Sequence, residues 1–86
     1  MKEFQPFIYK ENDPEEDYEW YYALYAGKGL NKKYPDDHNI WLWLEYVNLW
    51  ERHAIEDISS LEAPSKNDFR EIIQCIFRTK KWQIAT

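Results

Sequence analysis

The residues most often used in catalysis and metal binding are few in this chain, and their spacing does not group them. His38 and His53 are far apart in the sequence, and Cys75 is the only cysteine. A zinc site needs several nitrogen or sulfur ligands at characteristic spacings, and a cysteine nucleophile needs an activating base. With two glycines in all, the chain also has no glycine-rich phosphate loop. We therefore predict no catalytic residue, no metal ligand and no cofactor, and expect that the protein is not an enzyme.

One segment does have a pattern typical of binding. Acidic residues crowd it without an intervening Lys or Arg, and aromatic residues follow them directly. Rows of carboxylates flanked by aromatic rings can imitate the charge of a nucleic acid and occupy a partner's basic groove. The alternative is an ordinary solvated helix start, because acids in a first helical turn interact favourably with the helix dipole. The predicted partner-binding residues are Glu11, Asp13, Glu15, Glu16, Asp17, Tyr18, Glu19 and Tyr22, with Asp36 and Asp37 as an extension.

The overall composition agrees with a binding module. The formal net charge is −5, and the chain has five Trp, seven Tyr and four Phe. Negative charge disfavours direct binding to nucleic acid or to anionic membranes, both of which attract basic proteins. Trp and Tyr are enriched where protein interfaces concentrate their binding energy. We therefore expect a small acidic module that binds a protein with a basic surface, for example an inhibitor of a nucleic-acid-handling protein.

Two other functions fit the same composition. One is a homodimeric regulatory or assembly subunit, which would bury its many aromatic side chains between two copies. The other is a helix-turn-helix-like DNA binder that reads DNA with its last helix. A mild positive bias of that helix comes from Lys66, Arg70, Arg78, Lys80 and Lys81.

Proline and capping residues divide the first part of the chain into an arm and a helix. Pro6 disfavours a helix interior, so residues 1–12 are expected to form an extended arm. Asp13 can cap a helix and Pro14 suits its first position, which predicts a helix over residues 14–26.

Two more helices are predicted downstream. Apolar residues recur at helical spacing over residues 36–57 and make two adjacent stripes. Ser65 and Asp68 form a capping-box-like start for a third helix over residues 66–79. The residues expected in the shared core are Trp43, Val47, Ile73 and Ile76. The predicted fold is a single mainly α domain over residues 1–86, with three helices, the extended arm and a short β-pairing between that arm and the C-terminal tail.

The expected location is the cytoplasm. No apolar run is long enough to span a bilayer, and a lone cysteine fits a reducing compartment.

Overall fold

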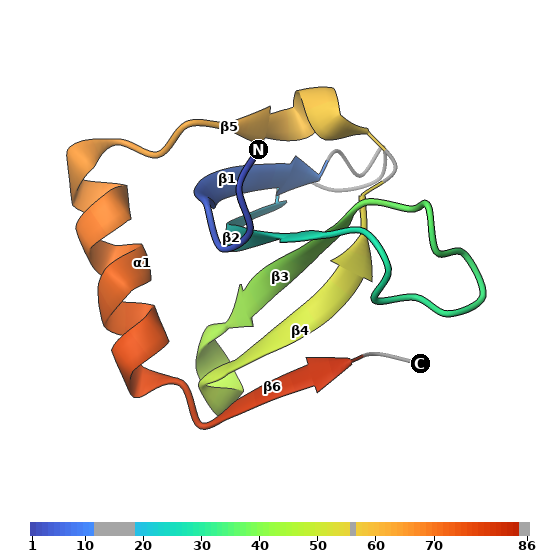
Figure 1. The fold of residues 1–86 in the computed structure, drawn as a ribbon. Helices are drawn as coiled ribbons and strands as arrows, with labels where there is room; N and C mark the ends of the chain where they lie inside the picture. The colour runs from blue at the N-terminus through green and yellow to red at the C-terminus, as the bar shows by residue number, and fades with distance from the viewer. Residues whose placement is uncertain (12–18, 56, 85–86) are drawn as a thin grey trace.

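The computed structural model describes residues 1–11, 19–55 and 57–84. These residues form a six-stranded sheet in the order β5-β1-β2-β3-β4-β6 and one α-helix of 13 residues (Figure 1). The prediction of a mainly α, three-helix domain is therefore wrong, because the described residues form a mainly β structure with one helix. The elements are β1 (Pro6–Glu11), β2 (Glu19–Gly27), β3 (Asn39–Leu44), β4 (Leu49–Ala54), β5 (Leu61–Glu62), α1 (Lys66–Arg78) and β6 (Lys81–Ile84).

Two connections cross the sheet on opposite faces. The segment from β4 to β5 passes over one face, where Ile55 and Leu61 pack against side chains of β2 and β3. The helix α1 joins β5 to β6 across the other face (Figure 1). Neighbouring strands are antiparallel, except that β6 lies parallel to β4. The sheet is therefore covered on both faces along part of its length.

The core under α1 is built from tryptophan. Trp50 is fully buried, and its ring stacks on Trp82 with centroids 5.7 Å apart. The indole N–H of Trp50 donates a hydrogen bond to Thr79 Oγ1 at 2.7 Å, just beyond the helix. Ile72 and Cys75 are the fully buried residues of α1 in this cluster. Large buried rings such as that of Trp50, with its N–H satisfied, are expected to contribute strongly to stability.

The helix predicted over residues 14–26 is wrong for its described part, which belongs to β2. Its first residues, including the expected cap Asp13, lie outside the described residues. In β2 the side chains alternate between faces: Tyr22 and Leu24 point to the α1 face, and Ala23 and Tyr25 to the other. Tyr and Trp favour extended strands. Because both faces of this strand are buried, its sequence lacks the polar alternation that marks a strand.

The helix predicted over residues 36–57 is a hairpin of β3 and β4. The run Ile40–Leu44 is apolar at every position because both of its faces are covered, and such a run also matches helical spacing. The turn is a short 3-10 helix followed by Asn48 in the left-handed region, with φ 51° and ψ 48°. Asn tolerates that conformation better than most residues. Of the residues expected in the core, Trp43 is buried, but Val47 is exposed in this turn.

The third helix is confirmed. It runs from Lys66 to Arg78, and Ser65 Oγ accepts a hydrogen bond from the backbone N–H of Asp68 at 3.1 Å. The residues that face the core are shifted by one position from those predicted. Ile72 and Cys75 are fully buried, whereas the predicted Ile73 and Ile76 are half-buried.

The terminal segments are extended, as predicted, but their pairing differs. The arm forms β1, which pairs with β2 on one side and β5 on the other. The tail forms β6 on the far edge of the sheet, beside β4 and not beside the arm. Its Trp82 ring nevertheless meets the Phe4 ring edge-on, with centroids 5.7 Å apart. Within the described ranges, no helix is long and apolar enough to cross a membrane.

Candidate functional site

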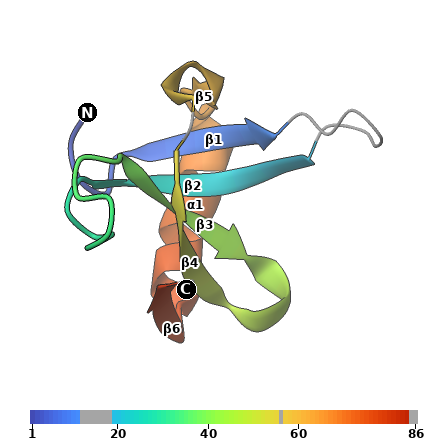
Figure 2. The same cartoon turned by 90° about the vertical axis from the view of Figure 1, so that its right-hand side faces the viewer.

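The predicted acidic surface is only partly described, and its described members lie in two places. Glu11 and Glu19 end β1 and begin β2, where they stand directly opposite each other. Asp36 and Asp37 lie in the β2–β3 loop, at the other end of β2 (Figure 2). At about 3.3 Å per residue, the length of β2 separates the two places by roughly 26 Å. The structure therefore does not bring the two pairs together. The members outside the described residues are Asp13, Glu15, Glu16, Asp17 and Tyr18.

Tyr22, the remaining predicted residue, belongs to the helix contact. Its hydroxyl donates to Asp68 Oδ1 at 3.4 Å, and its ring packs at the edge of the core under α1. Burial, together with the nearby Asp68 carboxylate, raises the pKa of Tyr22 to about 12. Glu11 and Glu19 project from the opposite face, so Tyr22 is not part of their surface.

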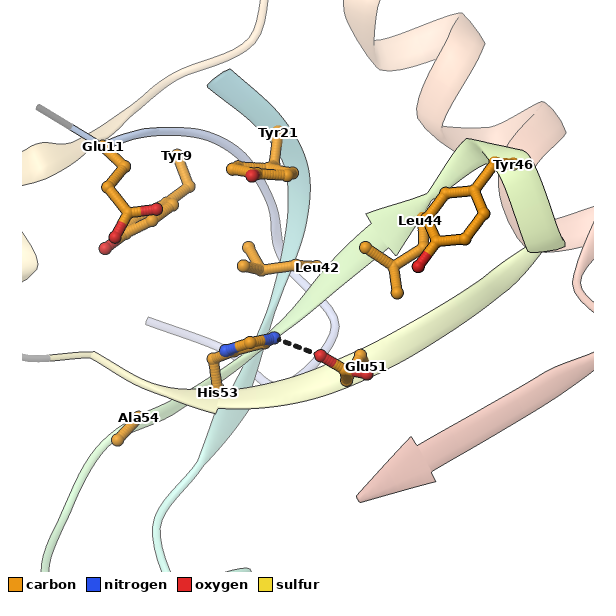
Figure 3. Close-up of a pocket in the computed structure, with 9 residues that line it drawn as sticks. All are labelled: Tyr9, Glu11, Tyr21, Leu42, Leu44, Tyr46, Glu51, His53 and Ala54. Carbon is orange, nitrogen blue, oxygen red and sulfur yellow. Dashed lines mark hydrogen bonds and ion pairs between the residues drawn. The ribbon is translucent and has the colours of Figure 1, made fainter. Parts of the chain in front are cut away.

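Next to Glu11 and Glu19, the face away from α1 contains a hollow of about 410 Å³. Figure 3 shows the rings of Tyr9 and Tyr21 on one side of it and His53 with Glu51 on the other, with Leu42 between them. The side chains that line the hollow come mainly from the four strands β1, β2, β3 and β4. Within a strand, side chains two residues apart share one face of the sheet. The lining residues are Tyr9, Glu11, Tyr21, Leu42, Leu44, Tyr46, Glu51, His53 and Ala54.

Negative charge dominates one wall of this hollow. The Tyr21 hydroxyl donates a 2.6 Å hydrogen bond to Glu19 Oε2. That bond, with burial and the charges of Glu19 and Glu11, raises the pKa of Tyr21 to about 12. The phenol therefore stays neutral at physiological pH and holds the Glu19 carboxylate beside the hollow. Like charges directly opposite across two strands are generally destabilising, so we expect the Glu11 and Glu19 pair to cost stability in the free protein.

The facing wall carries the one basic side chain among the lining residues, His53. Its Nε2 donates to Glu51 Oε1 at 2.7 Å, so a carboxylate already occupies that nitrogen. Among the described residues, the lining includes neither Lys nor Arg. Carboxylates and tyrosine rings together attract cations, through charge and through the negative faces of the rings. The hollow is therefore suited to a basic side chain.

A second hollow, of about 480 Å³, adjoins the first where β2 and β3 separate. It shares Tyr21, Leu44 and Tyr46 with the first. The residues that complete it are Trp20, Tyr22, Trp43 and Glu45. Its walls are mainly aromatic, and Glu45 there accepts a 3.2 Å hydrogen bond from the Trp43 indole.

Sequence reasoning missed Tyr9, Tyr21, Tyr46, Glu51 and His53. Tyr9 with Glu11, and Glu51 with His53, are each two residues apart, the spacing that shares one face of a strand. A strand interpretation would have grouped each pair. It would not have brought β1 and β4 to the same hollow, which depends on the pairing of the whole sheet.

The other candidates for chemistry do not form a site. Cys75 is buried, and burial raises the pKa of its thiol, which disfavours the reactive thiolate. Among the described residues, no group of three or more His, Cys, Asp or Glu could hold a metal ion. The same residues contain a single α-helix, so they lack the helix pair on which a helix-turn-helix depends. Comparison with protein families, curated proteins and solved structures gives no match to this chain.

Proposed function

We propose that this protein is a small acidic binding module that occupies a basic surface of a partner protein. The observation that carries the proposal is the hollow that combines Tyr9 and Tyr21 with the carboxylates of Glu11, Glu19 and Glu51. Glu11 and Glu19 are kept opposite each other at a cost in stability, and a cation from a partner would relieve that cost. Two carboxylates that repel each other in the free protein are thus prepared for a positively charged group.

Within this proposal, we favour an inhibitor that blocks a nucleic-acid-handling protein. Such a partner has a basic groove lined with Lys and Arg, which bind phosphates. Carboxylates on neighbouring strands, in a chain of net charge −5, could take the place of those phosphates. The binding role needs no catalytic residue, metal or cofactor, and we propose none.

We further propose that the module acts in the cytoplasm. Its one cysteine is free and buried, an arrangement that is compatible with a reducing compartment.

The test compares two double variants with the same change in charge. The partner is first isolated with the wild-type protein as bait, and its affinity is then measured for each variant. Glu11→Lys with Glu19→Lys reverses the carboxylates at the hollow, whereas Asp36→Lys with Asp37→Lys reverses exposed carboxylates at the other end of β2. The first pair is expected to weaken binding by about a hundredfold and the second by less than about threefold.

Salt provides an independent readout in the same experiment. Binding by the wild type is expected to weaken as salt rises, because salt screens charges over about 8 to 10 Å. Equal losses for both double variants would show that net charge, and not the hollow, governs binding. A partner that binds both double variants as tightly as the wild type would reject the proposal.

A further inference from the structure

The sheet opens between β2 and β3. Their ladder pairs Ala23–Gly27 with Asn39–Leu42 and stops there. Yet β2 begins at Glu19, and β3 continues to Leu44 in its pairing with β4. Trp20 and Tyr22 on one strand, and Trp43 on the other, therefore lie beyond the end of the shared ladder. Figure 2 shows β1 with β2 and the β3–β4 hairpin diverging in this direction.

The backbone of β2 presents polar groups to this opening. Tyr25 directs both of its backbone groups to the arm that leads into β1: its N–H donates to Gln5 O at 2.9 Å, and its C=O accepts from Phe4 N–H at 2.7 Å. In an antiparallel strand, successive residues direct these groups to alternate sides. Tyr22 and Trp20 therefore direct theirs away from β1, to the side on which β3 would continue. An exposed strand edge of this kind can pair with an extended peptide.

Each side of the opening has a hollow with its own chemistry. One is aromatic, lined by Trp20, Tyr22 and Trp43. The other is the acidic hollow described above, and the two share Tyr21. An extended segment in the opening would send alternate side chains into the two hollows.

From these observations we infer that the opening between β2 and β3 binds an extended segment of the basic partner as an added strand. Arg or Lys side chains at alternate positions enter the acidic hollow, and apolar side chains between them enter the aromatic hollow. Charge complementarity favours a basic segment, because Glu11 and Glu51 line the acidic hollow. Glu19 adds a third carboxylate there, held by the hydroxyl of Tyr21. The inference rests on the proposed function and adds to it the shape and residue pattern of the bound segment.

The test uses a short peptide that alternates arginine and valine, since this pattern supplies both kinds of side chain in the required order. It is titrated into isotope-labelled protein, and hydrogen exchange of backbone amides is followed by NMR. Saturating peptide is expected to slow exchange of the Trp20 and Tyr22 amides by about tenfold or more, because they acquire hydrogen-bond partners. A peptide that alternates glutamate and valine is expected not to bind.

Backbone pairing is tested by a chemically matched control. The arginine–valine peptide with alternate amides N-methylated keeps every side chain and charge but loses strand hydrogen bonds. Its affinity is expected to fall by about tenfold or more. Equal affinity for both peptides, or unchanged exchange at Trp20 and Tyr22, would overturn strand addition.

The outcomes separate the inference from the proposed function. If N-methylation has no effect but Glu11→Lys with Glu19→Lys still weakens peptide binding, the proposed acidic module is supported and the added strand is rejected. If the arginine–valine peptide does not bind, or the glutamate–valine peptide binds as well, the inferred occupant is wrong, and the double variants against the isolated partner still test the module. If Trp20 and Tyr22 become protected as protein concentration rises without peptide, a second copy of this chain fills the opening and the inferred partner segment is wrong.

Discussion

The face under α1 and the acidic hollow use aromatic residues in opposite ways. Under α1, Trp50 is fully buried, and its one polar group donates to Thr79. In the hollow, Tyr9 and Tyr21 are half-buried, and the Tyr21 hydroxyl holds a carboxylate at the protein surface. The first arrangement buries a large apolar area, and the residues of that cluster carry no charge. The second keeps like charges close together, which suggests that stability comes from one face and binding from the other.

The two ends of the β2–β3 pair also differ, because one is held by a buried polar network and the other is open. At the end near Gly27, the buried Asn39 side chain donates to the carbonyl oxygens of Gly27 and Asp37, at 3.1 Å and 3.0 Å. Arg52 in turn donates to Asn39 Oδ1 at 2.8 Å. A buried polar network of this kind fixes the strands in one arrangement. At the opposite end the ladder stops at Ala23 and Leu42, and this opening is where we propose that a partner adds a strand.

The largest effect is expected at the centre of the face under α1. Trp50→Ala should lower the free energy of unfolding by about 3 to 5 kcal/mol, because it removes a buried ring and leaves a cavity. The matched control is Tyr46→Ala at the hollow, where the side chain is 83% exposed. That change should alter stability by less than about 0.5 kcal/mol. Urea denaturation of both variants measures the difference, and equal losses would show that the two faces contribute alike.

The next effect concerns neighbouring residues of α1. Ile72→Ala should cost about 2 to 5 kcal/mol, because this side chain is fully buried among the tryptophans. Ile73→Ala should cost clearly less, because Ile73 is only half-buried. The same urea experiment ranks them. If Ile73→Ala proves the more damaging change, then the rotation of α1 against the sheet is other than described.

Only part of the fold was predictable from the sequence. The helix α1 was predictable because its information is local: Ser65 caps it, and one of its faces is apolar. The strands β2 and β3 were not, because residues buried on both faces give a continuous apolar run that has no distinctive period. Strong capping residues ahead of such runs then favoured helices. The pairing with distant segments, which decided the outcome, leaves no mark in the local sequence.

The candidate site was predictable to a similar degree. The composition indicated an acidic, aromatic binding surface, and Glu11 and Glu19 were among the predicted residues. Their proximity arises from β1–β2 pairing and not from a shared helix. Glu51 and His53 could not be added from sequence, because only the assembled sheet brings β4 to the same hollow.

A smaller effect is expected at alkaline pH. Tyr21 has an ordinary pKa of 10.0 and a folded-state pKa of about 12, so folding favours its neutral form. Its contribution to stability is complete below pH 10 and is lost as the pH rises toward about 12. Tyr21→Phe should flatten part of this decline, and Tyr22, whose pKa is also raised to about 12, should account for a further part. Unfolding free energies measured across this range test the assignment. An unchanged slope in Tyr21→Phe would contradict it.

Whether the hollow gives up stability for binding is tested most directly by measuring both properties in Glu11→Lys. A Lys opposite Glu19 replaces repulsion with attraction, so the free energy of unfolding should rise by about 0.2 to 1 kcal/mol. The same change places a positive charge at the hollow, so affinity for the arginine–valine peptide should fall by about tenfold. The Glu11→Lys variant should therefore be more stable than the wild type and bind the peptide less well. A variant that loses both stability and binding, or that binds as the wild type does, would contradict this prediction.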